Sequence, residues 1–374
     1  MKYSLIFALV MILISSSSFA EEQAKRSRPF PYGPLCCAAK GEVDDSRIMF
    51  VDVYGKSGVF SIDVETKEIK EVFIKSGKYF SIDWLSLFSV RGGLYLTYLH
   101  CQDKSNCFNY LSFINHKYEE EVLLKSKYPS EIYHSPVPSP DNNYVAIIKS
   151  KPDAGTSDWQ SHVLILNQKK TMNNVLDVSY ISGAPNFEVM YLWNNDSDRL
   201  YVIATKDNET TFYVYHVDHA KLMTLAKMDS INIFYAYPFP VNNRYILFLT
   251  KEKSAQGSFI GKFDIVNATM EIKNINDGDM ANHDQVIMPL YPFMSKLPEE
   301  KYFVIAGHKD LKSNIFYVFD QELKIVNRYH DKGGKKVSPI GYNKILGKAL
   351  LFSDRELINF NYGDKPSIET IHEW

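Results

Sequence analysis

The chain has 374 residues, 45% of them apolar, so it can bury a large core and is too long for one small sandwich. Its formal net charge of −2 gives no electrostatic basis for binding nucleic acid. The 25 Tyr and 23 Phe residues favour a β-rich protein, because aromatic side chains suit a pleated, half-buried surface.

Residues 1–20 have the three parts of a signal peptide. Lys2 supplies the positive charge, residues 5–14 form an apolar core, and Ser18 and Ala20 are small residues before a cleavage site. The apolar core is shorter than the roughly 18 residues that span a bilayer, so we favour cleavage over a membrane anchor. The sequence therefore predicts an exported protein, periplasmic or extracellular, with no stable membrane insertion.

Residues 21–31 are charged and contain proline, and they are predicted to be a flexible lead-in. Lys25, Arg26 and Arg28 also allow a basic tether for an acidic partner, which we consider the less favoured interpretation. The remainder, residues 32–374, is predicted to be a single domain.

The most informative stretch is Ser-Pro-Asp-Asn-Asn at 139–143, followed by a β-branched and aromatic run at 144–149. Proline fixes φ, and Asp and Asn side chains cap their own backbone, so this is a turn that leads into a strand. A related event recurs along the chain, in which a strand ends in Asp or Asn, a polar turn follows and a second strand returns. The turn residues, spaced 41 to 56 apart, are Asp63, Asn115, Asn167, Asp218, Asp264, Asp320 and Asn361.

Each of these hairpins is preceded by another strand, and a more irregular strand precedes most of those. The regular preceding strands are 47–53, 94–100, 144–150, 200–206, 245–251, 302–308 and 349–355. Repeats of this length with four strands each are typical of propeller blades. The sequence predicts an all-β, seven-bladed β-propeller with four antiparallel strands per blade, closed by packing of the first blade on the seventh without a shared terminal strand.

The segment 139–147, with weaker echoes at 193–204 and 239–249, resembles the Ser-Pro-Asp-Gly-Lys signature of TolB-like propellers. Only this unit keeps Ser-Pro-Asp intact, and Asn142 stands where the family has Gly. The resemblance implies an exported binding or scaffolding propeller, or the propeller domain of a peptidase or lyase. It assigns no catalytic residue.

Two cysteine pairs occur in a chain expected to reach an oxidising compartment. Cys101 and Cys107 flank a short loop between two strands, so we predict a disulfide there. Cys36 and Cys37 are adjacent, which fits either two small residues on opposite faces of a strand or a strained vicinal disulfide with a redox role. We favour the first interpretation.

A cluster of oxygen and imidazole groups at 274–284 is the best candidate for a metal site, although we favour a polar loop and predict no cofactor. The possible ligands are Asp277, Asp279, His283 and Asp284. No nucleophile motif of the Gly-x-Ser-x-Gly kind is present, since the serine of GSFIG (257–261) is misplaced.

Four histidines near strand ends, His100, His134, His283 and His308, could ring one mouth of a central channel, although unrelated surface histidines are the simpler account. If the protein is an enzyme, His134 and His283 are the candidate catalytic residues. Predicted inner strands also carry many tyrosines, a residue type that is enriched at binding surfaces. The predicted binding residues are Tyr133, His134, Tyr235, Tyr237 and Tyr291.

These observations favour an exported, non-catalytic propeller that binds a protein, a peptide or a cell-envelope ligand at its channel mouth. The alternative is a propeller enzyme, a lyase or hydrolase that acts on a sugar or lactone. A redox partner protein that uses Cys36 and Cys37 is a third and weaker hypothesis.

Overall fold

The structure is a computed structural model. It describes residues 37–38, 40–41, 47–52, 58–75, 79–82, 87–90, 92–103, 106–152, 159–177, 189–206, 209–229, 231–233, 239–241, 243–252, 259–274, 294–297, 301–307, 314–320, 322–331, 338–343, 348–352, 356–361 and 365–373. The regular secondary structure in these ranges is all β-strand, and none of them holds a helix that could cross a membrane. The predicted signal peptide and lead-in lie outside the described residues.

The described strands form seven sheets. Sheet 1 contains β1 (Cys37–Ala38), β3 (Arg47–Asp52), β4 (Gly58–Asp63) and β5 (Ile69–Phe73). Sheet 2 contains β2 (Lys40–Gly41), β6 (Tyr79–Ser81), β7 (Leu87–Val90), β8 (Gly93–Cys101), β9 (Cys107–Asn115) and β10 (Glu120–Lys125). Sheet 3 contains β11 (Ile132–Pro138), β12 (Tyr144–Pro152), β13 (Trp159–Asn167) and β14 (Met172–Asp177). Sheet 4 contains β15 (Val189–Trp193), β16 (Arg199–Lys206), β17 (Glu209–His216) and β18 (Lys221–Asp229).

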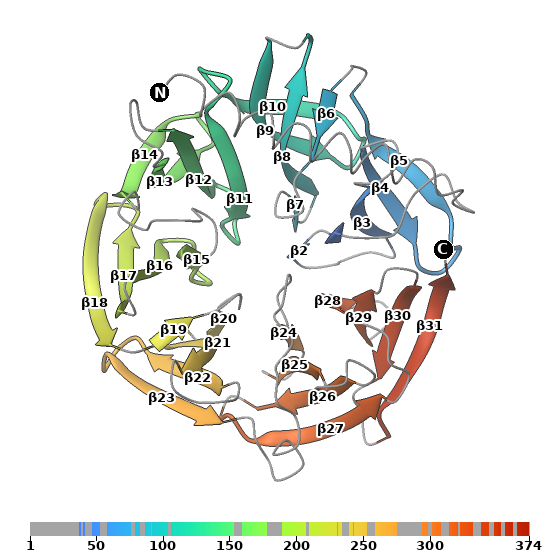
Figure 1. The fold of residues 1–374 in the computed structure, drawn as a ribbon, viewed down its shortest axis with the longest axis vertical. Coiled ribbons are helices and arrows are strands. Elements are labelled where there is room, and N and C mark those ends of the chain that lie inside the picture. The colour runs from blue at the N-terminus through green and yellow to red at the C-terminus, as the bar shows by residue number, and fades with distance from the viewer. Residues whose placement is uncertain are drawn as a thin grey trace, which may run out of the picture.

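The last three sheets complete the ring seen in Figure 1. Sheet 5 contains β19 (Ile231–Ile233), β20 (Phe239–Val241), β21 (Tyr245–Glu252), β22 (Phe259–Asp264) and β23 (Thr269–Asn274). Sheet 6 contains β24 (Met294–Leu297), β25 (Lys301–Gly307), β26 (Asn314–Phe319) and β27 (Ile325–Asp331). Sheet 7 contains β28 (Ser338–Asn343), β29 (Lys348–Phe352), β30 (Glu356–Asn361) and β31 (Ser367–Glu373). The sheets follow one another in chain order around a common centre, and the C-terminus lies beside sheet 1.

The predicted all-β class is confirmed, and five of the seven sheets have four antiparallel strands in chain order. Sheets 2 and 5 differ because their innermost layer is divided. In sheet 5, β19 pairs with one end of β21 and β20 with the other. In sheet 2, β6 and β7 divide β8 in the same way. The prediction of four antiparallel strands in every blade is wrong for sheet 2, because it has six strands and its β2 pairs with β7 in the parallel sense.

Five of the predicted Asp and Asn turns between the last two strands of a unit form by one mechanism, in which the side-chain oxygen accepts backbone hydrogen bonds. Asp63, for example, accepts hydrogen bonds through Oδ1 from the backbone N–H groups of Glu65 (3.0 Å) and Thr66 (2.9 Å), which is how such side chains stabilise turns. In the six predicted turns that the structure describes, a later residue lies in the left-handed region: Lys67, Tyr118, Lys170, Ala220, Ala268 and Leu323. In sheet 4 the turn is closed by a backbone hydrogen bond from the Ala220 N–H to the Val217 carbonyl. The turn therefore begins one residue before the predicted Asp218.

The turns between the first two strands of neighbouring units are linked across sheets. Ser139 closes its own turn, since its Oγ accepts from the Tyr144 N–H (3.0 Å) and donates to Asp141 Oδ1 (2.6 Å). The Asp141 N–H donates to Ser197 Oγ of sheet 4 (3.1 Å). In the turn of sheet 4, the Asn195 N–H donates a hydrogen bond to Asn243 Oδ1 of sheet 5 (2.9 Å). The turn at 139–143 and the corresponding turns of sheets 4 and 5 are therefore joined by a continuous chain of hydrogen bonds.

Buried apolar clusters lie between neighbouring sheets. Among the described residues, separate clusters join sheets 1 and 2, sheets 2 and 3, and sheets 3 and 4. A larger cluster extends over sheets 4 to 7. A last one joins sheet 7 back to sheet 1 through Phe50 and Phe60 on one side and Leu350 and Leu357 on the other. Apolar packing thus continues around the whole ring, as expected for sheets that bury both faces.

Candidate functional site

The inner strand β11 carries two of the predicted binding residues, and successive residues of a strand face opposite ways. Tyr133 is 5% exposed and packs against sheet 2 in a cluster with Tyr95, Leu111 and Val145. Burial, followed by the nearby Glu131 carboxylate, raises the pKa of Tyr133 to about 12. The side chain therefore serves mainly as packing between sheets 2 and 3.

His134 is 3% exposed and takes part in a short polar chain. Its Nε2 shares a hydrogen bond with Ser150 Oγ (3.2 Å), and Ser150 Oγ shares another with Ser161 Oγ (2.9 Å). The second ring nitrogen, Nδ1, has no hydrogen-bond partner among the described residues. Burial lowers the pKa of His134 to about 3, so the ring is neutral at physiological pH.

A bulge interrupts β11 immediately after His134. Ser135 has a φ of 54°, an uncommon conformation for a residue with a side chain. Two aromatic residues of sheet 4 hold this bulge: the Tyr191 hydroxyl donates to the Ser135 carbonyl, and Trp193 Nε1 donates to the Val137 carbonyl (2.9 Å). Tyr191 of β15 therefore forms a contact between sheets 3 and 4, and its side chain is 5% exposed.

The sequence analysis missed the ion pair between the buried Glu131 and the half-buried Lys149. Glu131 is 3% exposed, forms an ion pair with Lys149 and accepts a hydrogen bond from the Lys127 N–H (2.6 Å). Asn109 Nδ2 of sheet 2 donates to the Glu131 carbonyl (2.8 Å), which ties the two sheets together. The available signal was an acidic residue directly before an apolar inner strand, where burial is costly unless the charge is paired.

A half-buried carboxylate, Glu120, links sheets 1 and 2. It forms an ion pair with Lys75 and accepts hydrogen bonds from Tyr98 and Ser112, the latter at 2.8 Å. Burial raises the pKa of Glu120, but these three donors outweigh that effect and the net pKa is lowered. The carboxylate is thus held in its charged form as a structural link.

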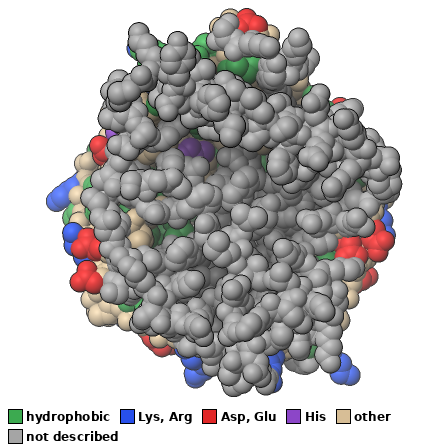
Figure 2. All heavy atoms as spheres, in the orientation of Figure 1, with side chains coloured by type: hydrophobic (Ala, Val, Ile, Leu, Met, Phe, Trp, Pro, Cys, Tyr) green, Lys and Arg blue, Asp and Glu red, His purple; other side chains and the backbone are tan. Residues whose placement is uncertain are grey.

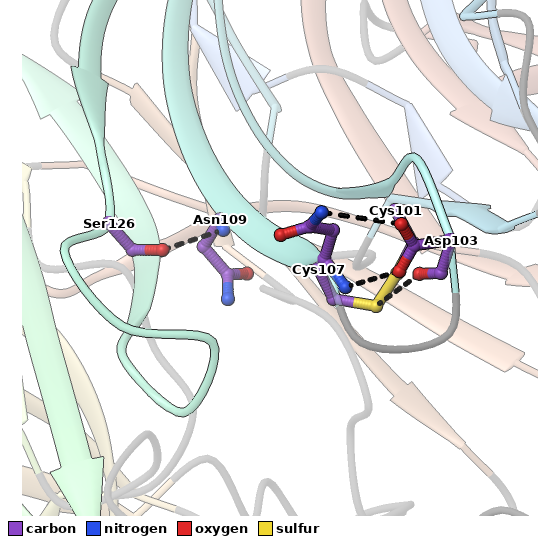
Figure 3. The surroundings of a disulfide bond; sticks show 6 residues. Cys101, Asp103, Cys107, Asn109 and Ser126 are labelled. Carbon is purple, nitrogen blue, oxygen red and sulfur yellow. Dashed lines mark hydrogen bonds between the residues drawn. A yellow bond between two sulfur atoms is a disulfide. The ribbon is translucent and has the colours of Figure 1, made fainter.

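The predicted disulfide between Cys101 and Cys107 is present in the structure. The two residues are direct register partners on β8 and β9, with a Cα–Cα distance of 3.9 Å. Figure 3 shows the bond on the hairpin that joins these strands, beside the hydrogen-bonded pair Asn109 and Ser126. The disulfide therefore closes a loop next to the connection that leads to Glu131 and sheet 3.

The remaining predicted site residues lie outside the described residues: Tyr235, Tyr237, Tyr291, Asp277, Asp279, His283 and Asp284, together with Cys36. Within the part of the chain that the structure describes, no group of three or more His, Cys, Asp or Glu side chains could hold a metal ion. On the face shown in Figure 2, the charged side chains of described residues lie around the periphery. Of the predicted binding residues, the structure therefore describes Tyr133 and His134.

No protein-family model matches the chain, and no curated protein matches its sequence significantly. Solved structures do match. Prolyl oligopeptidase B from Galerina marginata has a TM-score of 0.61 at 8% identity, over 98% of this chain and 54% of that one. An oligogalacturonate lyase in complex with manganese has a TM-score of 0.56 at 10% identity, over 91% of each chain.

TolB from Acinetobacter baumannii also matches, with a TM-score of 0.44 at 11% identity, over 83% of this chain and 66% of that one. The chain therefore spans about half of the peptidase and about two thirds of TolB. Sequence identities of this size report on the fold alone. The chain therefore shares the fold of two of these solved structures, the oligopeptidase and the lyase, which is the β-propeller fold that its sequence predicted.

Proposed function

We propose that the protein is a closed seven-bladed propeller, exported through a signal peptide at residues 1–20, that binds a protein, peptide or cell-envelope ligand at its channel mouth without catalysis. The supporting observation is the burial of His134, whose Nε2 is engaged by Ser150 Oγ at 3.2 Å. A general base must reach its substrate within hydrogen-bonding distance, and a histidine 3% exposed between two sheets is poorly placed for that. This favours binding over chemistry.

Partner capture in the native cell envelope tests this proposal. The wild-type protein is compared with the double variant Tyr235→Ala and Tyr237→Ala, and with Tyr133→Phe as a matched control that keeps the packing between sheets 2 and 3. We expect one specific cross-linked partner with the wild type and the control, and its loss in the double variant. Capture that is unchanged in the double variant would contradict binding at these tyrosines.

A sugar lyase is the second candidate, because the lyase match covers 91% of both chains. In that case His283, with Asp277, Asp279 and Asp284, would be the acid, base or metal-binding groups. Incubation of the purified protein with oligogalacturonate and Mn²⁺, followed by ultraviolet detection of unsaturated products, tests this alternative. Product formed by the wild type and lost in His283→Ala would replace the binding proposal with the enzyme.

A further inference from the structure

The segment 37–41 lies inside the ring and passes from one sheet to the next. Its first strand, β1, pairs antiparallel with β3 of sheet 1, where Cys37 is opposite Val51. Its second strand, β2, pairs with β7 of sheet 2 in the parallel sense, where Lys40 is opposite Phe88 and Gly41 opposite Ser89. β2 also lies close to β28 of sheet 7, and Figure 1 shows it near the centre of the ring.

This pairing is an exception in the described part of the chain, where every other strand pair is antiparallel. A strand that is added to a sheet from a distant part of the sequence uses main-chain hydrogen bonds and needs little sequence complementarity. The inner edge of β7 is the edge that remains after β7 has paired with β8, so it can accept one more strand.

The contact between β2 and β7 is small. It contains two register pairs, whereas β12 and β13 of sheet 3 share nine. Because the net contribution of one backbone hydrogen bond to stability is small, a two-pair ladder can detach without unfolding the sheets around it. The described neighbours Phe88, Ser89 and Val90 are half-buried, so this edge keeps some exposure with β2 in place.

We infer that the inner edge of β7 is a peptide-binding edge that the protein's own β2 occupies in the free state. The occupant it fits is an extended peptide from a partner protein, aligned parallel to β7 and containing a small residue such as the Gly41 of the resident strand. Displacement of β2 then couples partner binding to release of the segment. This inference rests on the proposed binding function and specifies its partner as an extended peptide.

Proline substitutions in the full mature protein test the inference. Alternate residues of a strand aim their N–H groups at opposite edges, so only one of Lys40 and Gly41 donates to β7. Lys40→Pro and Gly41→Pro should therefore differ, and Lys40→Ala should leave the backbone pairing intact. The probe is a fluorescent synthetic peptide with the sequence of residues 38–45.

We expect one proline variant to bind the peptide about tenfold more tightly than the wild type. This value applies if β2 covers the edge in about nine of ten wild-type molecules, because the proline would then make the edge available in all of them. The other proline variant and Lys40→Ala should resemble the wild type. Equal peptide affinity in all four proteins would overturn the inference.

Hydrogen exchange on the wild type provides a readout that does not depend on how the variants fold. In the segment Leu87–Val90, amides that face β2 should exchange at least an order of magnitude faster than those that bond to β8, because the short ladder opens locally. Uniformly slow exchange would show that β2 is a permanent strand and would overturn the inference. Neither result bears on partner capture through Tyr235 and Tyr237, so the two proposals can fail separately.

Discussion

Tyr133 and His134 show how one residue of sequence decides which neighbour a side chain meets. Strand alternation directs Tyr133 toward the apolar cluster shared with sheet 2, and it directs His134 to the other face, where Ser150 and Ser161 extend a polar chain. Both residues are suited by type to a binding surface, yet both are buried. The residue types suggested a binding surface, but burial keeps both side chains away from solvent and from a ligand.

His134 should make the protein sensitive to acid. Burial lowers its pKa to about 3 in the folded protein, whereas a histidine in the unfolded chain titrates near 6.5. The unfolded state takes up the proton first, so the stabilising contribution is complete above about pH 6.5 and decreases as the pH falls toward 3. At pH 5 the loss relative to pH 7 should be about 2 kcal/mol.

Denaturant unfolding of the wild type and of His134→Gln at pH 7 and pH 5 measures this contribution. Glutamine has no charge over this range and can bond to Ser150, so the variant should lose about 2 kcal/mol less than the wild type on acidification. Identical pH dependence in the two proteins would mean that His134 is not the group responsible.

Repeated turns dominate at the scale of the structural element. The turn at 139–143 owes its shape to Asn142, which has a φ of 60°. Ser197 and Asn243 take the same region in the corresponding turns of sheets 4 and 5. The TolB-like signature has Gly at this position, and the structure gives the reason, since Gly and Asn reach positive φ at low cost.

Two substitutions at Asn142 should separate backbone strain from side-chain contact. Asn142→Gly should change the free energy of unfolding by less than about 0.5 kcal/mol, because the backbone conformation suits glycine. Asn142→Ala should cost about 1 kcal/mol or more, since alanine is disfavoured at positive φ. Denaturant midpoints of both variants provide the measurement, and an alanine variant as stable as the glycine variant would contradict this account.

The disulfide should act locally. Replacement of Cys101 and Cys107 by Ala removes a bridge across a short loop, for which a cost of about 2 kcal/mol is expected. Hydrogen exchange should increase mainly at Asn106 and Asn109, because the loop is linked to Ser126 through Asn109. A Ser112→Ala variant, on β9 but facing Glu120, is the control and should leave loop exchange unchanged. Increased exchange in distant sheets would contradict a local role.

For the whole molecule, the apolar clusters between sheets determine the free energy and the cooperativity of unfolding. Leu357 of sheet 7 is fully buried in the cluster shared with sheet 1. Leu357→Ala should therefore cost about 2–5 kcal/mol through the cavity it leaves. Val326, 47% exposed on the outer strand β27, is the matched control, and Val326→Ala should cost less than about 0.5 kcal/mol.

Circular dichroism and tryptophan fluorescence should report one coincident unfolding transition for both variants, because the clusters connect all seven sheets. A separate early transition in Leu357→Ala would mean that the contact between sheets 1 and 7 is not integrated into one cooperative ring.

The strand type, the seven repeated units, the Asp and Asn turns and the pairing of Cys101 with Cys107 could all be predicted from the sequence. These depend on alternation, turn chemistry and short separations, which are local properties of the chain. Three features could not be predicted in this way: the burial of Tyr133, His134 and Tyr191, the ion pair of Glu131 with Lys149, and the pairing of β2 with sheet 2. These outcomes depend on which sheet faces which, and the contacts involved join residues that no local pattern relates.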